Sequence, residues 1–221
     1  NLQTLKLKLR KLENDQWWVE DIANTPGNKP ATSLYLRQLT PIYQSIKKAT
    51  DSILQSPTEE IPDTAQNLLL RLSLFNNALR DSNSSLEGFL ESGKLTKKSQ
   101  VRIKLNEAQD IFGHALSDRS HLDDQYTNLL DLINSELRSY VSFSKQAVKM
   151  RQSKYWNVAY YRLENQVMPL HNELQVRLSD LSKEHSDSLI SETKTMKQTT
   201  QISSAIAILL SIFIIYIGEY F

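Results

Sequence analysis

The feature that most constrains the fold is a helical spacing of apolar residues over a long stretch without proline. The chain has no proline between Leu95 and Met168, and apolar residues recur there at steps of three and four, which places them on one helix face. With only five glycines and six prolines among 221 residues, the sequence predicts an all-α fold, an elongated bundle of antiparallel helices. The pattern comprises Val101, Leu105, Ala108, Phe112, Leu116, Leu122, Tyr126, Leu129, Ile133, Leu137, Val141 and Val148.

Proline and glycine predict where the helices end. Asn24–Pro30 and Ser56–Asp63 each contain two prolines, which lack the N–H that the helical hydrogen-bond ladder needs. Another ending is expected at Gly93, because glycine readily adopts the left-handed conformation of a helix C-cap. Pro41 and Pro169 fall inside helical patterns, where we expect kinks, although Pro41 could instead open a new helix.

The step from Leu116 to Leu122 is too wide for a continuous apolar stripe. Either one helix continues there through a polar layer, or two helices meet at a tight turn. One helix over Leu95–Gln152 would be about 87 Å long, whereas the segment Pro62–Ser92 would span about 46 Å. This mismatch favours two stacked four-helix modules over four helices of equal length.

The last predicted helix begins near Tyr155 and changes character along its length. From His185 to Gln201 the positions in phase with the core become Ser188, Glu192 and Thr195. Because such a helix buries little apolar surface, it can shift or rotate at modest cost.

The helix then enters an uncharged apolar run, Ile202–Ile217. A helix of that length spans about 24 Å, and the residues that follow extend it toward the thickness of a hydrocarbon core. We therefore predict a transmembrane helix over 202–221 after a helical domain over 1–201; the alternative is a buried core helix. Leu2 and Leu5 open the chain in mid-helix, as expected if it begins just after an earlier span.

Composition and motifs exclude several classes of function. Basic and acidic residues number 26 and 25 and are interspersed, which argues against a nucleic-acid partner. The absence of cysteine excludes disulfides and thiolate metal sites, and no glycine-rich phosphate loop or nucleophile motif is present. His114, Asp118 and His121 share a helix face, but a polar surface layer explains them more simply than a metal site. We expect no enzymatic activity, cofactor or metal in this part of the protein.

Two clusters combine aromatic and basic residues and are the candidate ligand-binding residues. Aromatic faces near a guanidinium suit a small organic ion or the hot spot of a partner protein. The alternative is that these residues form the wide core of the bundle where helices enter and leave. The first cluster is Trp17, Trp18, Tyr35 and Arg37. The second is Tyr155, Trp156, Tyr160, Tyr161 and Arg162, and its candidate ligand-binding residues are Trp156, Tyr160 and Arg162.

The segment Ser153–Leu170, the apolar steps from Leu174 to Leu181, the polar helix and the ending ISSAIAILLSIFIIYIGEYF together resemble a known layout. They are similar to the membrane-returning end of four-helix and helical-bimodular ectodomains of bacterial chemoreceptors and histidine kinases, including the trimethylamine-oxide-sensing kinase type. The resemblance implies a periplasmic two-module bundle that dimerises and binds a small molecule or a periplasmic binding protein. It does not extend to HAMP or kinase residues.

We therefore expect the extracytoplasmic sensor region of a transmembrane signalling receptor in the inner membrane, with residues 1–201 periplasmic or extracellular. Ligand binding would pass a small helix displacement across the membrane. The rival hypothesis is a tail-anchored, SNARE-like structural protein whose bundle lies in the cytosol.

Overall fold

The computed structural model describes residues 2–55, 66–117 and 124–220, with side chains from Gln3 to Ile208. These ranges contain helices and no strand, which confirms the all-α prediction. The chain divides into two compact units. Unit 1 joins Asn1–Asp15 to Asn165–Phe221, and unit 2 is Gln16–Glu164.

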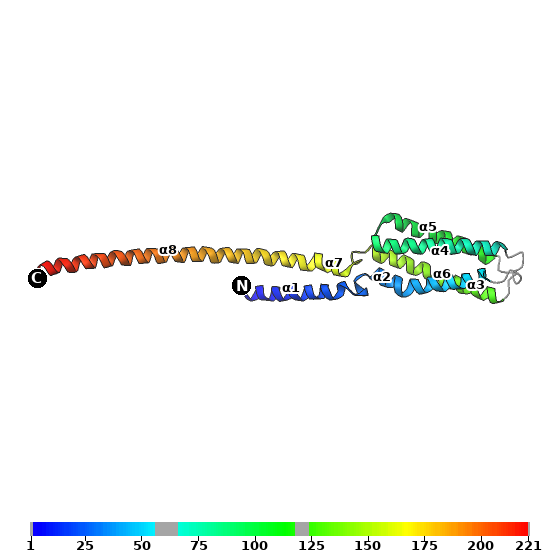
Figure 1. Cartoon of the computed structure of the whole chain (residues 1–221), viewed down its shortest axis with the longest axis horizontal. Helices are drawn as coiled ribbons and strands as arrows, with labels where there is room; N and C mark the ends of the chain where they lie inside the picture. The colour runs from blue at the N-terminus through cyan, green and yellow to red at the C-terminus, as the bar shows by residue number, and fades with distance from the viewer. Residues whose placement is uncertain (1, 56–65, 118–123, 221) are drawn as a thin grey trace. The chain divides into compact units, whose positions relative to one another are not determined.

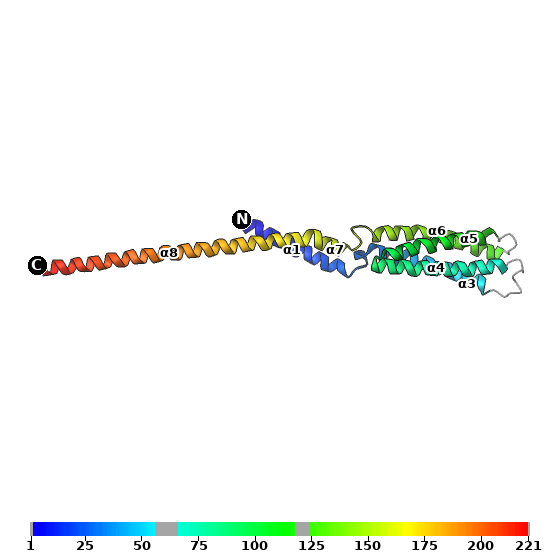
Figure 2. The ribbon, with the colours of Figure 1, turned by 90° about the horizontal axis from the view of Figure 1, so that it is seen from above.

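Unit 2 is a helical bundle built from long, mostly antiparallel rods. Helices α4 and α5 form a hairpin, and α3 lies beside α6, as Figure 1 and Figure 2 show from two directions. The elements of unit 2 are the end of α1 (Leu2–Ala23), η1 (Pro26–Asn28), α2 (Pro30–Leu34), η2 (Tyr35–Leu39), α3 (Thr40–Leu54), α4 (Gln66–Ser92), α5 (Leu95–Ser117), α6 (Asp124–Arg151) and α7 (Val158–Arg162).

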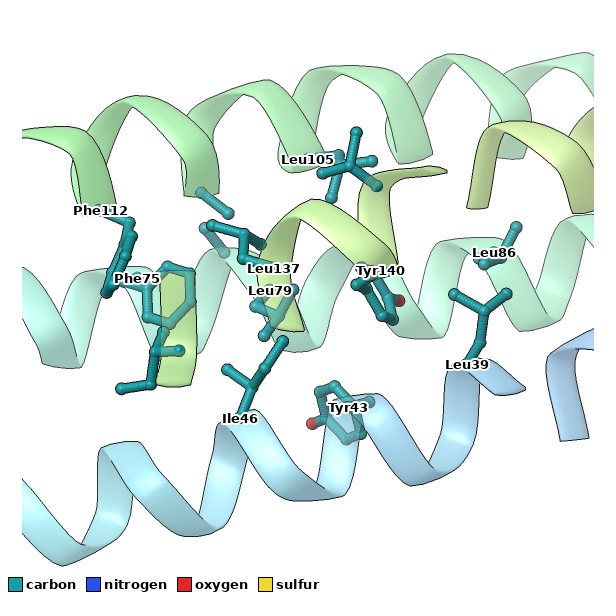
Figure 3. Close-up of a cluster of buried hydrophobic side chains, with 14 of the residues drawn as sticks. Leu39, Tyr43, Ile46, Phe75, Leu79, Leu86, Leu105, Phe112, Leu137 and Tyr140 are labelled. Atoms are coloured by element: carbon teal, nitrogen blue, oxygen red, sulfur yellow. The ribbon is translucent and has the colours of Figure 1, made fainter. Parts of the chain in front are cut away.

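The core of unit 2 comes from the apolar stripes of α3, α4, α5 and α6. Burying these side chains supplies the main favourable term for folding. Within the core the rings of Phe75 and Phe112 lie 5.0 Å apart, centroid to centroid. Figure 3 shows this core, with Leu39, Tyr43 and Ile46 facing Phe75, Leu79, Leu86, Leu105, Phe112, Leu137 and Tyr140.

Both prolines that fall inside helical patterns follow a short π-helical segment. Pro41 is the second residue of α3, which begins directly after η2. Pro169 is the second residue of α8 (Met168–Tyr220), which begins directly after η6 (Leu163–Val167). A proline removes one backbone donor and crowds the carbonyl four residues earlier. Widening the preceding turn accommodates that crowding, so the chain stays helical through both prolines.

The predicted helix ends are confirmed in part. The break at Asn24–Pro30 is present between α1 and α2. Two helices, α5 and α6, take the place of a single helix over Leu95–Gln152. The expected break at Ser56–Asp63 lies outside the described residues, as do Asp118 and His121. The start predicted near Tyr155 is wrong by three residues, because Asn157 caps α7.

Unit 1 contains the first part of α1 together with α8. Lys8 of α1 and Glu173 of α8 form an ion pair, and the hydrogen bond from Lys8 lowers the pKa of Glu173. The boundary predicted between Gln201 and Ile202 falls inside α8, which continues through it. Among the residues that the structure describes, no helix is both long enough and apolar enough to cross a membrane.

Gly93 ends α4 in the left-handed conformation, as the sequence predicts. Its φ is +70°, and its N–H donates to the Phe89 carbonyl at 2.8 Å. A Cβ at this position would lie 2.7 Å from Nη2 of Arg151. The Arg151 Nε in turn donates to the Leu90 carbonyl at 2.8 Å, so a cation satisfies a carbonyl of the last turn of α4.

Replacing Gly93 by alanine should therefore destabilise the protein. The left-handed backbone alone costs about 1–2 kcal/mol for a residue with a Cβ, and the Arg151 guanidinium must also move. Urea denaturation should show a lower midpoint. The matched control is Gly113→Ala in α5, where an added Cβ meets nothing within 4 Å. This control should gain about 0.5–1 kcal/mol. Equal midpoints for the two variants would contradict the assignment.

Candidate functional site

The candidate site is the end of unit 2 where the chain enters and leaves the bundle. We call it the junction and define it as residues 16–29 and 152–162. Its centre is Asn28, whose side chain is buried, with 7% exposed. The Asn28 amide Nδ2 donates to the Ala23 carbonyl at 2.9 Å, and its Oδ1 accepts from the Ala159 N–H at 2.9 Å. One side chain thus bridges the end of α1 and the start of α7, 131 residues away.

Both bonds of Asn28 satisfy groups that a helix leaves without partners. The last carbonyls of a helix have no donor within the helix, and its first N–H groups have no acceptor. The local sequence supplies a second cap, because the Asn157 Oδ1 accepts from the Tyr160 N–H at 2.8 Å. Two asparagines therefore cap successive amides of α7, one locally and one from the start of unit 2.

An aromatic and cationic stack joins the same two segments. The guanidinium carbon of Arg162 on α7 lies 4.1 Å from the ring centroid of Trp18 on α1. Such a contact contributes about 0.5–2 kcal/mol, more where it is shielded from water. The two clusters that the sequence predicts separately therefore meet, through one residue of each.

A second stack holds the turn between α6 and α7. The guanidinium carbon of Arg151 lies 4.1 Å from the ring centroid of Trp156. Because Arg151 also donates to the end of α4, it links α4, α6 and the turn. Partial burial lowers the pKa of Arg151, but a guanidinium stays charged at neutral pH.

The outer surface of the turn carries a smaller cluster. The rings of Tyr155 and Tyr161 meet edge to face, 4.6 Å between centroids, and the Lys154 Nζ lies 4.9 Å from the Tyr155 centroid. The hydrogen bond with Lys154 lowers the pKa of Tyr155 and raises that of the lysine. This exposed cluster therefore presents the ring edges of two tyrosines and the ammonium group of Lys154 to a binding partner.

Two predicted ligand residues, Tyr35 and Arg37, lie on η2, outside the junction. Tyr35 is buried in the core, where its hydroxyl accepts from the Asn83 Nδ2 at 3.0 Å. The Asn83 Oδ1 accepts from the Tyr140 hydroxyl at 3.0 Å, and burial raises the pKa of both tyrosines. Arg37, two residues along η2, is exposed.

The remaining predicted residues belong to the junction. Trp17 and Tyr160 are 69% and 52% exposed, so their rings are open to a partner. One face of Trp18 and one of Trp156 are covered by the chain's own arginines. A partner at the junction would therefore contact the exposed rings of Trp17 and Tyr160 and the ring edges of Trp18 and Trp156.

Sequence reasoning missed Asn28 and Arg151. Asn28 reads as one of several helix-breaking residues, and its bonding partner is far away in the sequence. Asn157 carried a local signal, since asparagine is a preferred N-cap residue before a helical segment. Arg151 gave no such signal, because a basic residue in a last helical turn is ordinary.

Within residues 2–55, 66–117 and 124–220, no three His, Asp or Glu side chains come together as metal ligands would. In the junction, hydrogen bonds and stacked rings hold residues 16–29 against residues 152–162.

The chain was compared with family models, with curated proteins and with solved structures, and none of the three comparisons returned a match.

A double-mutant cycle measures the stack between Trp18 and Arg162. Trp18→Leu, Arg162→Gln and the double variant should give a coupling energy of about 0.5–2 kcal/mol in urea denaturation, because each single change removes the same contact. The control cycle pairs Trp17→Leu with Arg162→Gln. Trp17 points about 100° away around the helix, so its coupling should be near zero. Equal coupling in the two cycles would mean that the stack does not form.

Proposed function

We propose that the chain is the extracytoplasmic sensor region of a transmembrane signalling receptor. The observation that carries this proposal is the junction, where Asn28 and Trp18 hold the start of unit 2 against Ala159 and Arg162 at its end. A domain whose first and last segments contact each other can be inserted between two helices of a longer chain. A receptor that senses outside the membrane and signals through it needs this connectivity.

The exit helix supports the proposal. Helix α8 runs from Met168 to Tyr220 as one element of 53 residues, about 80 Å at 1.5 Å per residue. It passes through the polar segment 185–201 and reaches the apolar run Ile202–Ile217. We propose that this run crosses the inner membrane, with residues 1–201 outside the cytoplasm; the side chains of Leu209–Ile217 lie outside the described part.

A homodimer would account for the exposure of α8. Every described side chain from Gln175 to Ile208 is exposed in the single chain, and a helix gains most of its stability from packing. Leu174, Leu178 and Leu181 recur at coiled-coil steps. Unit 1 contributes two helices per chain, so two copies would form a four-helix module.

The signal would travel through the junction. We propose that a small molecule or a periplasmic binding protein contacts Trp17, Tyr160 and the edges of Trp18, Trp156 and Arg162. A ligand shifts a helix arrangement only as far as it binds one arrangement better than another. Because α7 and η6 lead directly into α8, a change in the Trp18 stack would reach α8 at Met168.

Cysteine labelling tests the location of unit 2, since this chain has no cysteine of its own. Ser142 is exposed on α6, and Ser142→Cys in the gene product should react with a membrane-impermeant maleimide on intact cells. The unsubstituted protein is the control for background. Labelling that appears only after lysis would place the bundle in the cytosol, as the tail-anchored alternative requires, and would contradict the sensor proposal.

A further inference from the structure

A groove of about 430 Å³ lies along the bundle between α5 and α6, away from the junction residues. Its size falls within the range of about 300–1,000 Å³ typical of small-molecule sites. Apolar side chains from both helices line it, with Leu95, Val101 and Leu105 on α5 and Val148 on α6. This groove cannot be recognised from the sequence, because its lining residues fit an ordinary core stripe and the positions beside it.

A buried hydroxyl without a partner lines this groove. Ser144 on α6 is 1% exposed, and its Oγ makes no hydrogen bond. Tyr140 donates its one hydroxyl proton to Asn83. The Ser144 hydroxyl lies close enough to oppose part of the rise in the Tyr140 pKa that burial causes, but the two hydroxyls form no hydrogen bond. A buried polar group without a partner is costly, and native proteins seldom keep one without a reason. A polar atom of a bound ligand in the groove would supply the missing partner.

The charged residues of the groove all have the same sign. Lys98 and Arg102 on α5 and Lys145 on α6 line it, and no acidic residue does. Among the described residues, none of the three cations takes part in an ion pair. Lysine and arginine stems cover apolar surface while their charged ends stay in water, so the groove combines an apolar lining with a positive rim.

We propose that this groove binds an amphipathic organic anion, a carboxylate attached to an apolar body of medium length. The apolar body lies along Leu95, Val101 and Leu105. The carboxylate lies within reach of Arg102 and accepts a hydrogen bond from the Ser144 hydroxyl, since ionised acceptors form the stronger bonds. This site does not depend on the sensor proposal, because the groove lies wholly within unit 2.

The test uses octanoate as the probe and isothermal titration calorimetry on the full chain reconstituted in lipid nanodiscs, with empty nanodiscs titrated as the blank. Octanoate should bind saturably at one site per chain, whereas acetate, which lacks the apolar body, and octylamine, which has the opposite charge, should not compete. Ser144→Ala and Arg102→Gln should each raise the dissociation constant by about tenfold, the value of one hydrogen bond to a charged group.

The matched control is Arg138→Gln, which removes an exposed arginine of α6 that does not line the groove. Its affinity for octanoate should be unchanged. Ser144→Ala should also melt no lower than the unsubstituted protein, which separates loss of the site from loss of the fold. No saturable binding, equal binding of octylamine, or unchanged affinity in both groove variants would each overturn the proposal.

Discussion

The architecture depends on one buried amide. Asn28 accepts from the Ala159 N–H and donates to the Ala23 carbonyl, so a single side chain completes the end of one helix and the start of another. Without it, the buried Ala159 N–H would lack a partner, at about 1–3 kcal/mol, and the Ala23 carbonyl of the exposed last turn of α1 would turn to water. The stack of Arg162 on Trp18 reinforces the same connection. The two ends of unit 2 are therefore held together by polar contacts, while the bundle itself is held by its apolar core.

The sequence predicts the features that depend on interactions between residues close together in the chain. Apolar spacing predicts the helices of the bundle, and Gly93 predicts a left-handed cap because few other residues tolerate its φ of +70°. The two internal prolines predict local distortion, and each follows a π-helical segment. The start of the last helix is wrong by three residues, because aromatic residues at Tyr155 and Trp156 resemble the beginning of an apolar stripe, whereas the cap is Asn157.

The candidate site is harder to predict because its contacts join distant segments. Trp18 and Arg162 belong to different sequence clusters, and only the fold brings them together. Tyr35 and Arg37 are two residues apart, yet one is buried in the core and the other is exposed, since residues at that spacing lie on different faces of a helix. The groove between α5 and α6 cannot be predicted from the sequence for the same reason. Only the structure shows that the buried Ser144 hydroxyl lacks a hydrogen-bond partner.

Amide hydrogen exchange at Ala159 measures whether Asn28 joins the two ends of unit 2. This N–H is the second of helix α7 and has no acceptor within the helix, so its protection should depend on Asn28. In Asn28→Ala, Ala159 should exchange much faster, while the Tyr160 amide, capped by Asn157, should remain protected. Asn28→Asp, which keeps an acceptor oxygen, should retain part of the protection at Ala159. Unchanged exchange at Ala159 in Asn28→Ala would contradict the account.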